Sequence, residues 1–262
     1  MALRLEGRNA LITGASDDAG SAAALRFSQE GANVFVTDRA LEAAQQVAAQ
    51  VAAAGRKAGA MAVDVSQEEQ VDRMVDRAVA ELGGIDILMV ADAVMHARYP
   101  GGKNPGYRLV DEPLADWRRV MSYNLDAYFL TDRAAARAMI KAGRGGRIIN
   151  YISVAALMAA PGGGDYSVSR AGAWMLTKVL ALELASQNIR VNAIAPGYLN
   201  SNMSREYYSG APDRLAAVLK RVPLGRIGEM REIADVALFL AGDESSYFTG
   251  QVLQPNGGLL VQ

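Results

Sequence analysis

The sequence has 262 residues, of which 51% are hydrophobic and 21% are charged, and its 27 basic and 28 acidic side chains give a formal charge of -1. This apolar content is enough for a deep core and excludes an intrinsically disordered chain. The near-zero charge gives no electrostatic basis for binding nucleic acid or an anionic membrane, so it favours a small-molecule partner.

Short runs of β-branched and apolar residues alternate along the chain with longer segments of helical period. The predicted strands are residues 9–13, 33–38, 58–65, 86–91, 147–152, 190–195 and 251–253. The predicted helices between them are residues 20–30, 41–54, 67–82, 116–142, 165–187 and 229–241. Because each pair of parallel strands needs a crossover, this alternation predicts a doubly wound α/β fold, with helices on both faces of a parallel sheet.

No Ser/Pro-rich linker or break in composition divides the chain, so residues 1–262 are predicted to form a single domain. The least regular segments, residues 95–113 and 198–228, follow the fourth and sixth predicted strands. Ligands of open α/β sheets bind beyond the carboxyl ends of the strands, so these two segments are the expected substrate walls.

The two segments carry different side chains. The first contains the basic residues His96, Arg98, Lys103 and Arg108. The second contains the apolar residues Met203, Tyr207, Tyr208, Leu215 and Val218. The basic set is able to meet an anionic substrate such as a coenzyme A thioester, or it is an exposed polar loop. The apolar set is a lid over a hydrophobic group, or it is ordinary packing.

The chain has no cysteine and a single histidine, His96. The missing cysteines exclude disulfides, thiolate nucleophiles and cysteine-bound metals, and one histidine excludes a histidine-rich metal cage. A Ser-His-Asp hydrolase would depend on His96 alone, and a solvated loop histidine is the alternative. Residues 1–6 lack the apolar core of a signal peptide, and no apolar run reaches the ~18 residues that cross a bilayer, so we expect a cytoplasmic protein.

The first predicted strand runs into a glycine turn that opens a helix and contains Gly14 and Gly20. Backbone N–H groups and the helix dipole at such a turn hold the pyrophosphate of a dinucleotide. Asp38 ends the second strand, where a carboxylate accepts hydrogen bonds from the ribose of NAD and repels the 2′-phosphate of NADP. The turn therefore favours NAD over NADP; the alternative for Asp38 is a helix cap before Leu41.

The glycine turn is the first of several motifs that follow one another in a fixed order. The motifs are residues 13–20, Asp64 with Val65, Asn124, Ser153, Tyr166, residues 192–197, Gly225 with Arg226, and residues 249–252. In this order they resemble the short-chain dehydrogenase/reductase family over essentially the whole chain. The resemblance implies a Rossmann-type fold and hydride transfer between NAD(H) and an alcohol or carbonyl substrate.

The resemblance also assigns roles to single residues. It implies that Tyr166 is the general acid or base at the substrate oxygen, that Ser153 positions this oxygen and that Asn124 organises a proton-relay water. It implies cofactor contacts from Gly14, Ser16, Asp17, Asp18, Ala19, Gly20, Asp38, Asp64, Val65, Ala91, Pro196, Gly197 and Leu199. It implies no metal ligand.

The Tyr-x-x-x-Lys motif of the family differs in this chain, which has Arg170 in the place of the lysine. That lysine supplies a positive charge one helical turn from the tyrosine and holds the nicotinamide ribose. Arginine keeps the charge, but its planar fork is not a compact ammonium, so we expect a weakened site with Arg170 as its fourth member. Lys178 lies two turns further along and is too distant to substitute.

Two further departures lie near the expected cofactor. Residues 90–94 replace the family's Asn-Asn-Ala-Gly motif, and Asp92 there accepts hydrogen bonds but does not donate them when ionised. Asp18 stands in place of the middle glycine of the turn, and Ala19 in place of isoleucine. A carboxylate aimed at the pyrophosphate from ~5 Å costs on the order of 1–3 kcal/mol at an effective dielectric of ~20, whereas a helix-capping role for Asp18 removes that cost.

These motifs leave two functions open. Retained Ser153 and Tyr166 favour an NAD-linked dehydrogenase or reductase in which Arg170 does the work of the lysine or recognises an anionic substrate. Asp18, Arg170 and residues 90–94 favour a non-catalytic member with weak or lost cofactor binding, which supports an active homologue or binds a ligand in the former pocket.

The resemblance implies an assembly, because the family commonly forms tetramers through its fifth and sixth helices and its C-terminal strand. The matching segments are residues 116–142, 165–187 and 250–262. The second segment has more apolar residues than one buried face needs, namely Trp174, Met175, Leu176, Leu180 and Leu184. We therefore predict a homo-oligomer, specifically a tetramer, or a hetero-oligomer with an active homologue.

Overall fold

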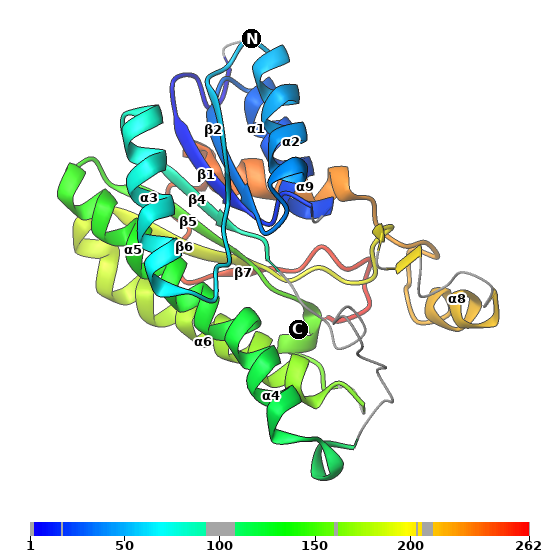
Figure 1. The fold of residues 1–262 in the computed structure, drawn as a ribbon. Coiled ribbons are helices and arrows are strands. Elements are labelled where there is room, and N and C mark those ends of the chain that lie inside the picture. Colours follow the sequence, from blue (N-terminus) through cyan, green and yellow to red (C-terminus); the bar gives the residue numbers. More distant parts are fainter. Residues whose placement is uncertain are drawn as a thin grey trace.

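A computed structural model describes residues 3–16, 18–92, 108–159, 162–202, 204–205 and 212–261. Its centre is a parallel seven-stranded sheet with the strand order β3-β2-β1-β4-β5-β6-β7 (Figure 1). The strands are β1 (Asn9–Thr13), β2 (Asn33–Asp38), β3 (Ala58–Ala62), β4 (Ile87–Val90), β5 (Gly146–Tyr151), β6 (Ile189–Ile194) and β7 (Val252–Leu253). The strand order reverses at β1, which confirms the predicted doubly wound α/β fold.

Helices cover both faces of this sheet (Figure 1). One face carries α1 (Asp18–Gln29), α2 (Leu41–Ala53) and α9 (Met230–Ala241). The other face carries α3 (Glu68–Leu82), α5 (Ala127–Ala142) and α6 (Gly164–Leu184). Two shorter helices are α4 (Leu114–Met121) and α8 (Pro212–Leu219), and α8 stands apart from the sheet.

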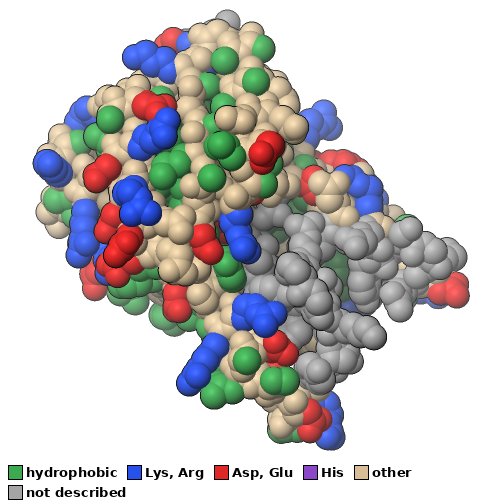
Figure 2. Space-filling model, viewed as in Figure 1, with side chains coloured by type: hydrophobic (Ala, Val, Ile, Leu, Met, Phe, Trp, Pro, Cys, Tyr) green, Lys and Arg blue, Asp and Glu red, His purple; other side chains and the backbone are tan. Residues whose placement is uncertain are grey.

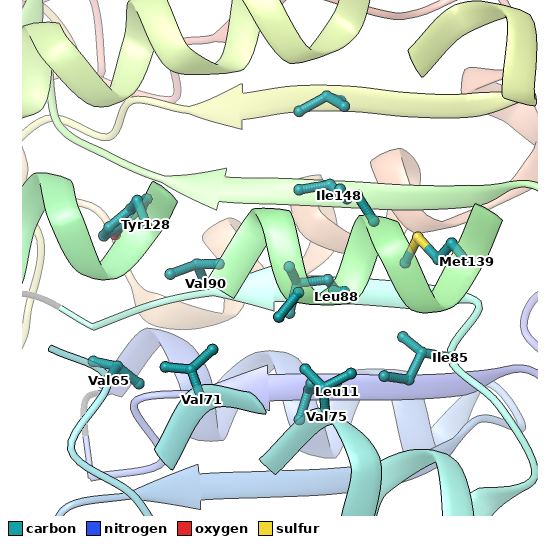
Figure 3. Packing of buried hydrophobic residues seen from close by; sticks show 14 of the residues in the cluster. Leu11, Val65, Val71, Val75, Ile85, Leu88, Val90, Tyr128, Met139 and Ile148 are labelled. Carbon is teal, nitrogen blue, oxygen red and sulfur yellow. The ribbon is translucent and has the colours of Figure 1, made fainter. Parts of the chain in front are cut away.

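Successive side chains of one strand enter two separate cores. In β1, Leu11 packs with Leu88 and Ile148 under α3, α5 and α6 (Figure 3). The next residue, Ile12, packs with Val36 under α1, α2 and α9. Because side chains alternate along a strand and both faces of the sheet are covered, both sets must be apolar. This is why continuous apolar runs marked the strands in the sequence.

The main differences from the prediction concern three elements, and the bounds of most others shift by one to three residues. The strand β3 ends at Ala62, three residues before the predicted end. The predicted helix 116–142 consists of α4 and α5, joined by a π-helical turn at Ser122–Asp126. One such turn widens the helix locally without ending its apolar period, so a single sequence does not reveal it. The helix α8 is absent from the predicted elements, although proline at its first position is a helix-start signal.

The apolar residues of α6 divide between the core and the surface. Trp174, Leu176 and Leu180 pack against the core, and Leu184 is buried. Of the five apolar residues that the sequence analysis expected to exceed one buried face, only Met175 is exposed. The expectation was wrong for the other four, because they pack towards the sheet. The exposed apolar stripe of α6 is formed by Val168, Met175, Val179 and Leu182.

Charged side chains of both signs are interspersed on the face of the molecule shown in Figure 2. Within the described residues, none of the helices combines the length and the apolar character that a bilayer span requires. The same residues contain no group of three or more histidine and acidic side chains that could hold a metal ion.

Candidate active site

The glycine turn lies at the carboxyl edge of the sheet, between β1 and α1, and two of its residues must be glycine. Gly14 has a φ of +72°, and a Cβ there would lie 2.9 Å from the carbonyl carbon of Ala91, just after β4. A Cβ at Gly20 would lie 2.3 Å from the carbonyl oxygen of Gly14, and Ala19 beside it is buried. The turn therefore brings the first N–H groups of α1 close to the ends of β1 and β4, as a dinucleotide pyrophosphate requires.

Asp38, at the end of β2, holds this turn from the side. Its carboxylate accepts a hydrogen bond of 2.7 Å from the Ser16 N–H and one of 3.0 Å from the Ala40 N–H. It does not cap α2, because Ala40 is the N-cap residue and no side chain caps that helix. A carboxylate has about four acceptor positions, so positions remain for ribose hydroxyls.

Asp18 is the first residue of α1, and its carboxylate is bound by a distant part of the chain. It accepts hydrogen bonds of 2.5 Å from the backbone N–H of Asn202 and of 2.8 Å from the Asn202 side-chain amide. The contact therefore differs from both possibilities raised by the sequence, a carboxylate that caps the helix and a carboxylate that faces only the pyrophosphate. It ties the glycine turn to the segment that follows β6.

Asp64 and Val65 lie just past the end of β3. Asp64 accepts hydrogen bonds of 2.6 Å from the Ser66 hydroxyl and of 3.1 Å from the Tyr123 hydroxyl. Burial raises the pKa of Asp64, but these donors and the charge of Arg39 outweigh it and hold the pKa below its ordinary value. Val65 is 2% exposed and packs in the core drawn in Figure 3, so its side chain is not open to a ligand.

Pro196, Gly197 and Leu199 follow β6. The Gly197 N–H donates to the carbonyl of Pro255 at 3.2 Å, and a Cβ at Gly197 would lie 2.9 Å from the Cα of Asn256. Leu199 is buried and lines a cavity of about 170 Å³. Close packing against the residues after β7 therefore already requires the glycine at position 197.

Ser153 follows β5 and begins the 3-10 turn Val154–Ala156, which packs against α6. Its Oγ accepts a hydrogen bond of 3.1 Å from the Ala155 N–H. Because a hydroxyl both donates and accepts, this bond leaves its proton available for a substrate oxygen. Tyr166 is half-buried in the first turn of α6, so the expected serine and tyrosine stand on adjoining elements.

Arg170 lies one turn after Tyr166 and is completely buried. Its Nη2 donates to the Asp92 carbonyl at 3.4 Å and to Oδ1 of Asn124 at 3.3 Å, and its Cζ lies 5.1 Å from the centroid of the Tyr166 ring. Burial lowers the pKa of Arg170, but the adjacent Tyr128 and Tyr166 outweigh it, so the guanidinium stays charged. The structure thus brings Asn124, Tyr166 and Arg170 into one cluster.

Asn124 is buried within the π-helical turn between α4 and α5. Such turns occur frequently at functional sites, because they turn a backbone or side chain out of the regular helical pattern. Here the turn directs the Asn124 side chain to Arg170. Lys178 is engaged elsewhere, with its Nζ 3.7 Å from the centroid of the Trp174 ring, so it does not replace the missing lysine.

Tyr128, which the sequence analysis did not single out, belongs to the same cluster. It is buried on the first turn of α5, and its ring centroid lies 5.2 Å from the Cζ of Arg170. The one available signal was its place in the motif around Asn124, four residues earlier. That spacing puts two residues on the same side of a regular helix.

Several expected residues of the site lie outside the described part of the chain. They are Asp17, His96, Arg98, Lys103, Met203, Tyr207 and Tyr208. Arg108 is exposed and pairs with Asp111 at 2.8 Å, and Leu215 and Val218 are half-buried on α8. The first expected substrate wall is therefore described only over residues 108–113, and the second is described except for residues 203 and 206–211.

The chain is similar to known proteins over nearly its full length. A family model described as enoyl-(acyl carrier protein) reductase matches residues 14–260. The 3-oxoacyl-(acyl-carrier-protein) reductase of Thermotoga maritima is 37% identical over 264 residues, which cover 99% of this chain and 100% of that protein. The crystal structure of a short-chain type dehydrogenase/reductase from Mycobacterium marinum is 37% identical, with a TM-score of 0.88, and the match covers 100% of this chain and 98% of that one.

Two other similar structures hold nicotinamide cofactors. A proposed 2-deoxy-d-gluconate 3-dehydrogenase from Agrobacterium tumefaciens has bound NADP; it is 31% identical, with a TM-score of 0.86, over 100% of this chain and 99% of that one. A 7α-hydroxysteroid dehydrogenase is complexed with NADH and 7-oxo glycochenodeoxycholic acid; it is 32% identical, with a TM-score of 0.89, over 98% of this chain and 96% of that one.

Proposed function

This chain belongs to the short-chain dehydrogenase/reductase family, and from that premise we propose that it is an NAD-linked oxidoreductase acting on an alcohol or carbonyl substrate. The observation that carries the proposal is the cluster in which Tyr166 lies beside the buried charge of Arg170 and Arg170 in turn contacts Asn124. A tyrosine beside a fixed cation has the chemistry of a general acid and base at a substrate oxygen.

The glycine turn and Asp38 are the residues that would hold the cofactor. The close approach at Gly14 and Gly20 holds the N-terminus of α1 against the ends of β1 and β4, where its N–H groups would bind a pyrophosphate. Asp38 has acceptor positions for the adenosine ribose, and its negative charge disfavours the additional phosphate of NADP, so NAD is the proposed cofactor. The nicotinamide, when bound, supplies or takes the hydride.

The side chains of the cluster handle the proton. The Tyr166 hydroxyl gives a proton to the substrate oxygen in reduction and takes it back in oxidation, while the Ser153 hydroxyl donates a hydrogen bond that positions the same oxygen. The positive charge of Arg170 lies 5.1 Å from the centroid of the Tyr166 ring, and Asn124 holds the guanidinium through Nη2. Arg170 thus takes over the charge of the family's lysine.

The proposed enzyme is an oligomer in the cytoplasm, with its subunit contacts on α5 and α6. The exposed apolar residues of α6 fall at intervals of seven, four and three residues, so they form one stripe along the helix. Phe129, on α5, is also 45% exposed. A second subunit would remove this apolar surface from water.

Titration of the purified protein with NAD+ and NADH tests the proposal, with calorimetric heat and melting temperature as readouts and NADP+ as the control. We expect micromolar NADH affinity and a rise of several degrees in melting temperature. A substrate screen should start with a 3-oxoacyl-(acyl-carrier-protein) and with 7-oxo glycochenodeoxycholic acid, which the similar proteins' descriptions name. The Tyr166→Phe variant is the inactive control, because it lacks the proposed acid/base hydroxyl.

Absence of nucleotide binding at millimolar concentration would overturn the proposal of an independent enzyme. The non-catalytic alternative would then be tested by purifying the protein from its own cells. In that alternative, an active member of the same family accompanies it at a fixed ratio.

A further inference from the structure

The positive charge of Arg170 lies inside the protein, where its burial is costly unless its neighbours compensate. Its Nη2 reaches two oxygen atoms, the Asp92 carbonyl and Oδ1 of Asn124. Its Nε and Nη1 have no hydrogen-bond partner among the described residues. Hydrogen bonds alone therefore do not account for the position of the guanidinium.

Aromatic rings supply the remaining contacts of the guanidinium. The Cζ of Arg170 lies 5.2 Å from the centroid of the Tyr128 ring and 5.1 Å from that of the Tyr166 ring. Both distances are within the range of a cation–π interaction, which is strongest where water is excluded. Tyr128 is itself completely buried, so its ring is a fixed part of the interior.

The Tyr128 hydroxyl is anchored at the carboxyl ends of β4 and β5. It lies 3.0 Å from the Asp92 carbonyl oxygen and is in hydrogen-bonding contact with the Tyr151 carbonyl oxygen. Figure 3 shows Tyr128 at this end of the strands, near Val90. Burial raises the pKa of Tyr128 above its ordinary value, so its hydroxyl remains a neutral donor.

One backbone atom joins the two side chains. The Asp92 carbonyl oxygen shares the single proton of the Tyr128 hydroxyl with the Tyr151 carbonyl oxygen, and it also accepts from Nη2 of Arg170 at 3.4 Å. Asp92 lies in residues 90–94, where the chain departs from its family, and Arg170 is another of the three departures. The two departures therefore meet at a single oxygen atom that Tyr128 holds in place.

We propose that Tyr128 is the positioning residue for Arg170: its ring covers the guanidinium and its hydroxyl fixes the carbonyl to which Arg170 donates. The charge then acts on Tyr166 and not on a bound cofactor, because the guanidinium has no exposed surface. This inference rests on the proposed function for its catalytic consequence. The contact between Tyr128 and Arg170 is tested separately from turnover.

A double-mutant cycle on turnover tests the catalytic consequence. Tyr128→Phe keeps the ring and removes the hydroxyl, and we expect kcat to fall about tenfold in the wild-type background with KM unchanged. Arg170→Met removes the charge, and in that background Tyr128→Phe should lower kcat less than about twofold. Tyr247→Phe, the same change at a fully exposed tyrosine, is the control and should leave kcat unchanged. Equal falls in both backgrounds would overturn the proposal.

Binding measurements test the orientation of the charge. If Arg170 acts only through Tyr166, Arg170→Met leaves the calorimetric Kd for NADH within about twofold of wild type. A lysine-like contact with the ribose instead predicts a Kd at least about tenfold weaker, and that result would overturn the proposal.

A protein that neither binds NADH nor turns over would refute the proposed function alone. The same four proteins then test the contact through their melting temperatures. Tyr128→Phe should lower the melting temperature by several degrees in the wild-type background and by much less in the Arg170→Met background. Identical shifts in the two backgrounds would show that Tyr128 does not hold Arg170.

Discussion

The Asp132 carboxylate accepts a hydrogen bond of 2.9 Å from the Asn150 side-chain amide, and both residues are completely buried between α5 and β5. The same amide donates to the Thr177 hydroxyl of α6 at 3.1 Å. Burial raises the pKa of Asp132 to about 7, and the Asn150 hydrogen bond offsets this only in part. The folded protein therefore keeps a proton that the unfolded chain loses at lower pH.

This proton predicts a pH-dependent stability. Because the folded state binds it more tightly, the free energy of unfolding should fall as the pH rises from about 4 to about 7. Asp132→Asn keeps the size and stays neutral, so it should remove this fall and stabilise the protein by a few kcal/mol at about pH 8. Urea unfolding at about pH 5 and about pH 8 measures the change. An Asp213→Asn variant, at an exposed position, is the control, and an unchanged pH profile in Asp132→Asn would refute the prediction.

Asp38 should determine both cofactor choice and local stability. Asp38→Ser removes the negative charge, so we expect the Kd for NADH to weaken and that for NADPH to improve, each by about tenfold. The N–H groups of Ser16 and Ala40 also lose their acceptor, which should cost about 2 kcal/mol of unfolding free energy. Asp38→Asn retains one acceptor oxygen, so its unfolding free energy should lie between those of the wild type and Asp38→Ser. An unaltered ratio of the two Kd values would exclude this role for Asp38.

Tyr166 should matter for turnover and not for stability. Tyr166→Phe keeps the ring beside Arg170 and removes the hydroxyl, so kcat should fall by about a hundredfold or more while the Kd for NADH stays the same. The melting temperature should change little, because the aromatic contact remains. Steady-state kinetics with calorimetry separates these effects, and a variant with wild-type kcat would remove Tyr166 from the chemistry.

The Asp18 carboxylate should oppose dinucleotide binding. A negative charge beside a pyrophosphate costs on the order of 1–3 kcal/mol, so Asp18→Asn should tighten the Kd for NADH by about tenfold. The asparagine oxygen still accepts one of the two hydrogen bonds from Asn202, which retains part of the contact with the segment after β6. Calorimetry at low and high salt checks the cause, since screening should reduce the gain. Weaker NADH binding in Asp18→Asn would show that the carboxylate helps the cofactor.

The exposed stripe of α6 should hold the subunits together. Leu182 is 83% exposed, and Leu182→Glu should dissociate the oligomer in sedimentation velocity at micromolar concentration, because a charge then enters an apolar interface. Val110→Glu makes the same change at a residue that is 84% exposed and lies before α4, so it should leave the assembly intact. A wild-type protein that sediments as a monomer would refute the predicted assembly.

The fold could be read from the sequence because its strands are buried on both faces. A run such as Leu11-Ile12 supplies both cores, so continuous apolar character identifies the strands without any alternation. The strand-turn-helix around Gly14 was equally visible, since close backbone approach admits only glycine there. These features depend on residues that are close together in the chain, and such patterns can be recognised in a single sequence.

The contacts that distinguish this site from its family could not be read in the same way. Arg170 meets Tyr128 and the Asp92 carbonyl only because α6, α5 and the end of β4 pack together. The contact of Asp18 with Asn202 joins residues 184 positions apart. Substitutions at single positions were visible in the sequence, whereas the partners that compensate for them depend on tertiary packing.

The strand order also sets the sequence of events during synthesis of the chain. The pairs β1–β2 and β2–β3 join near neighbours, such as Asn9 with Asn33, so they close early. The next pair joins Ala10 to Ile87 and must first close a long loop, at an entropic cost. Asn124, Ser153 and Tyr166 all come later in the chain. The residues of the glycine turn and Asp38 are therefore synthesised before the three residues of the proposed proton chemistry, and β1 has one unpaired edge until β4 is made.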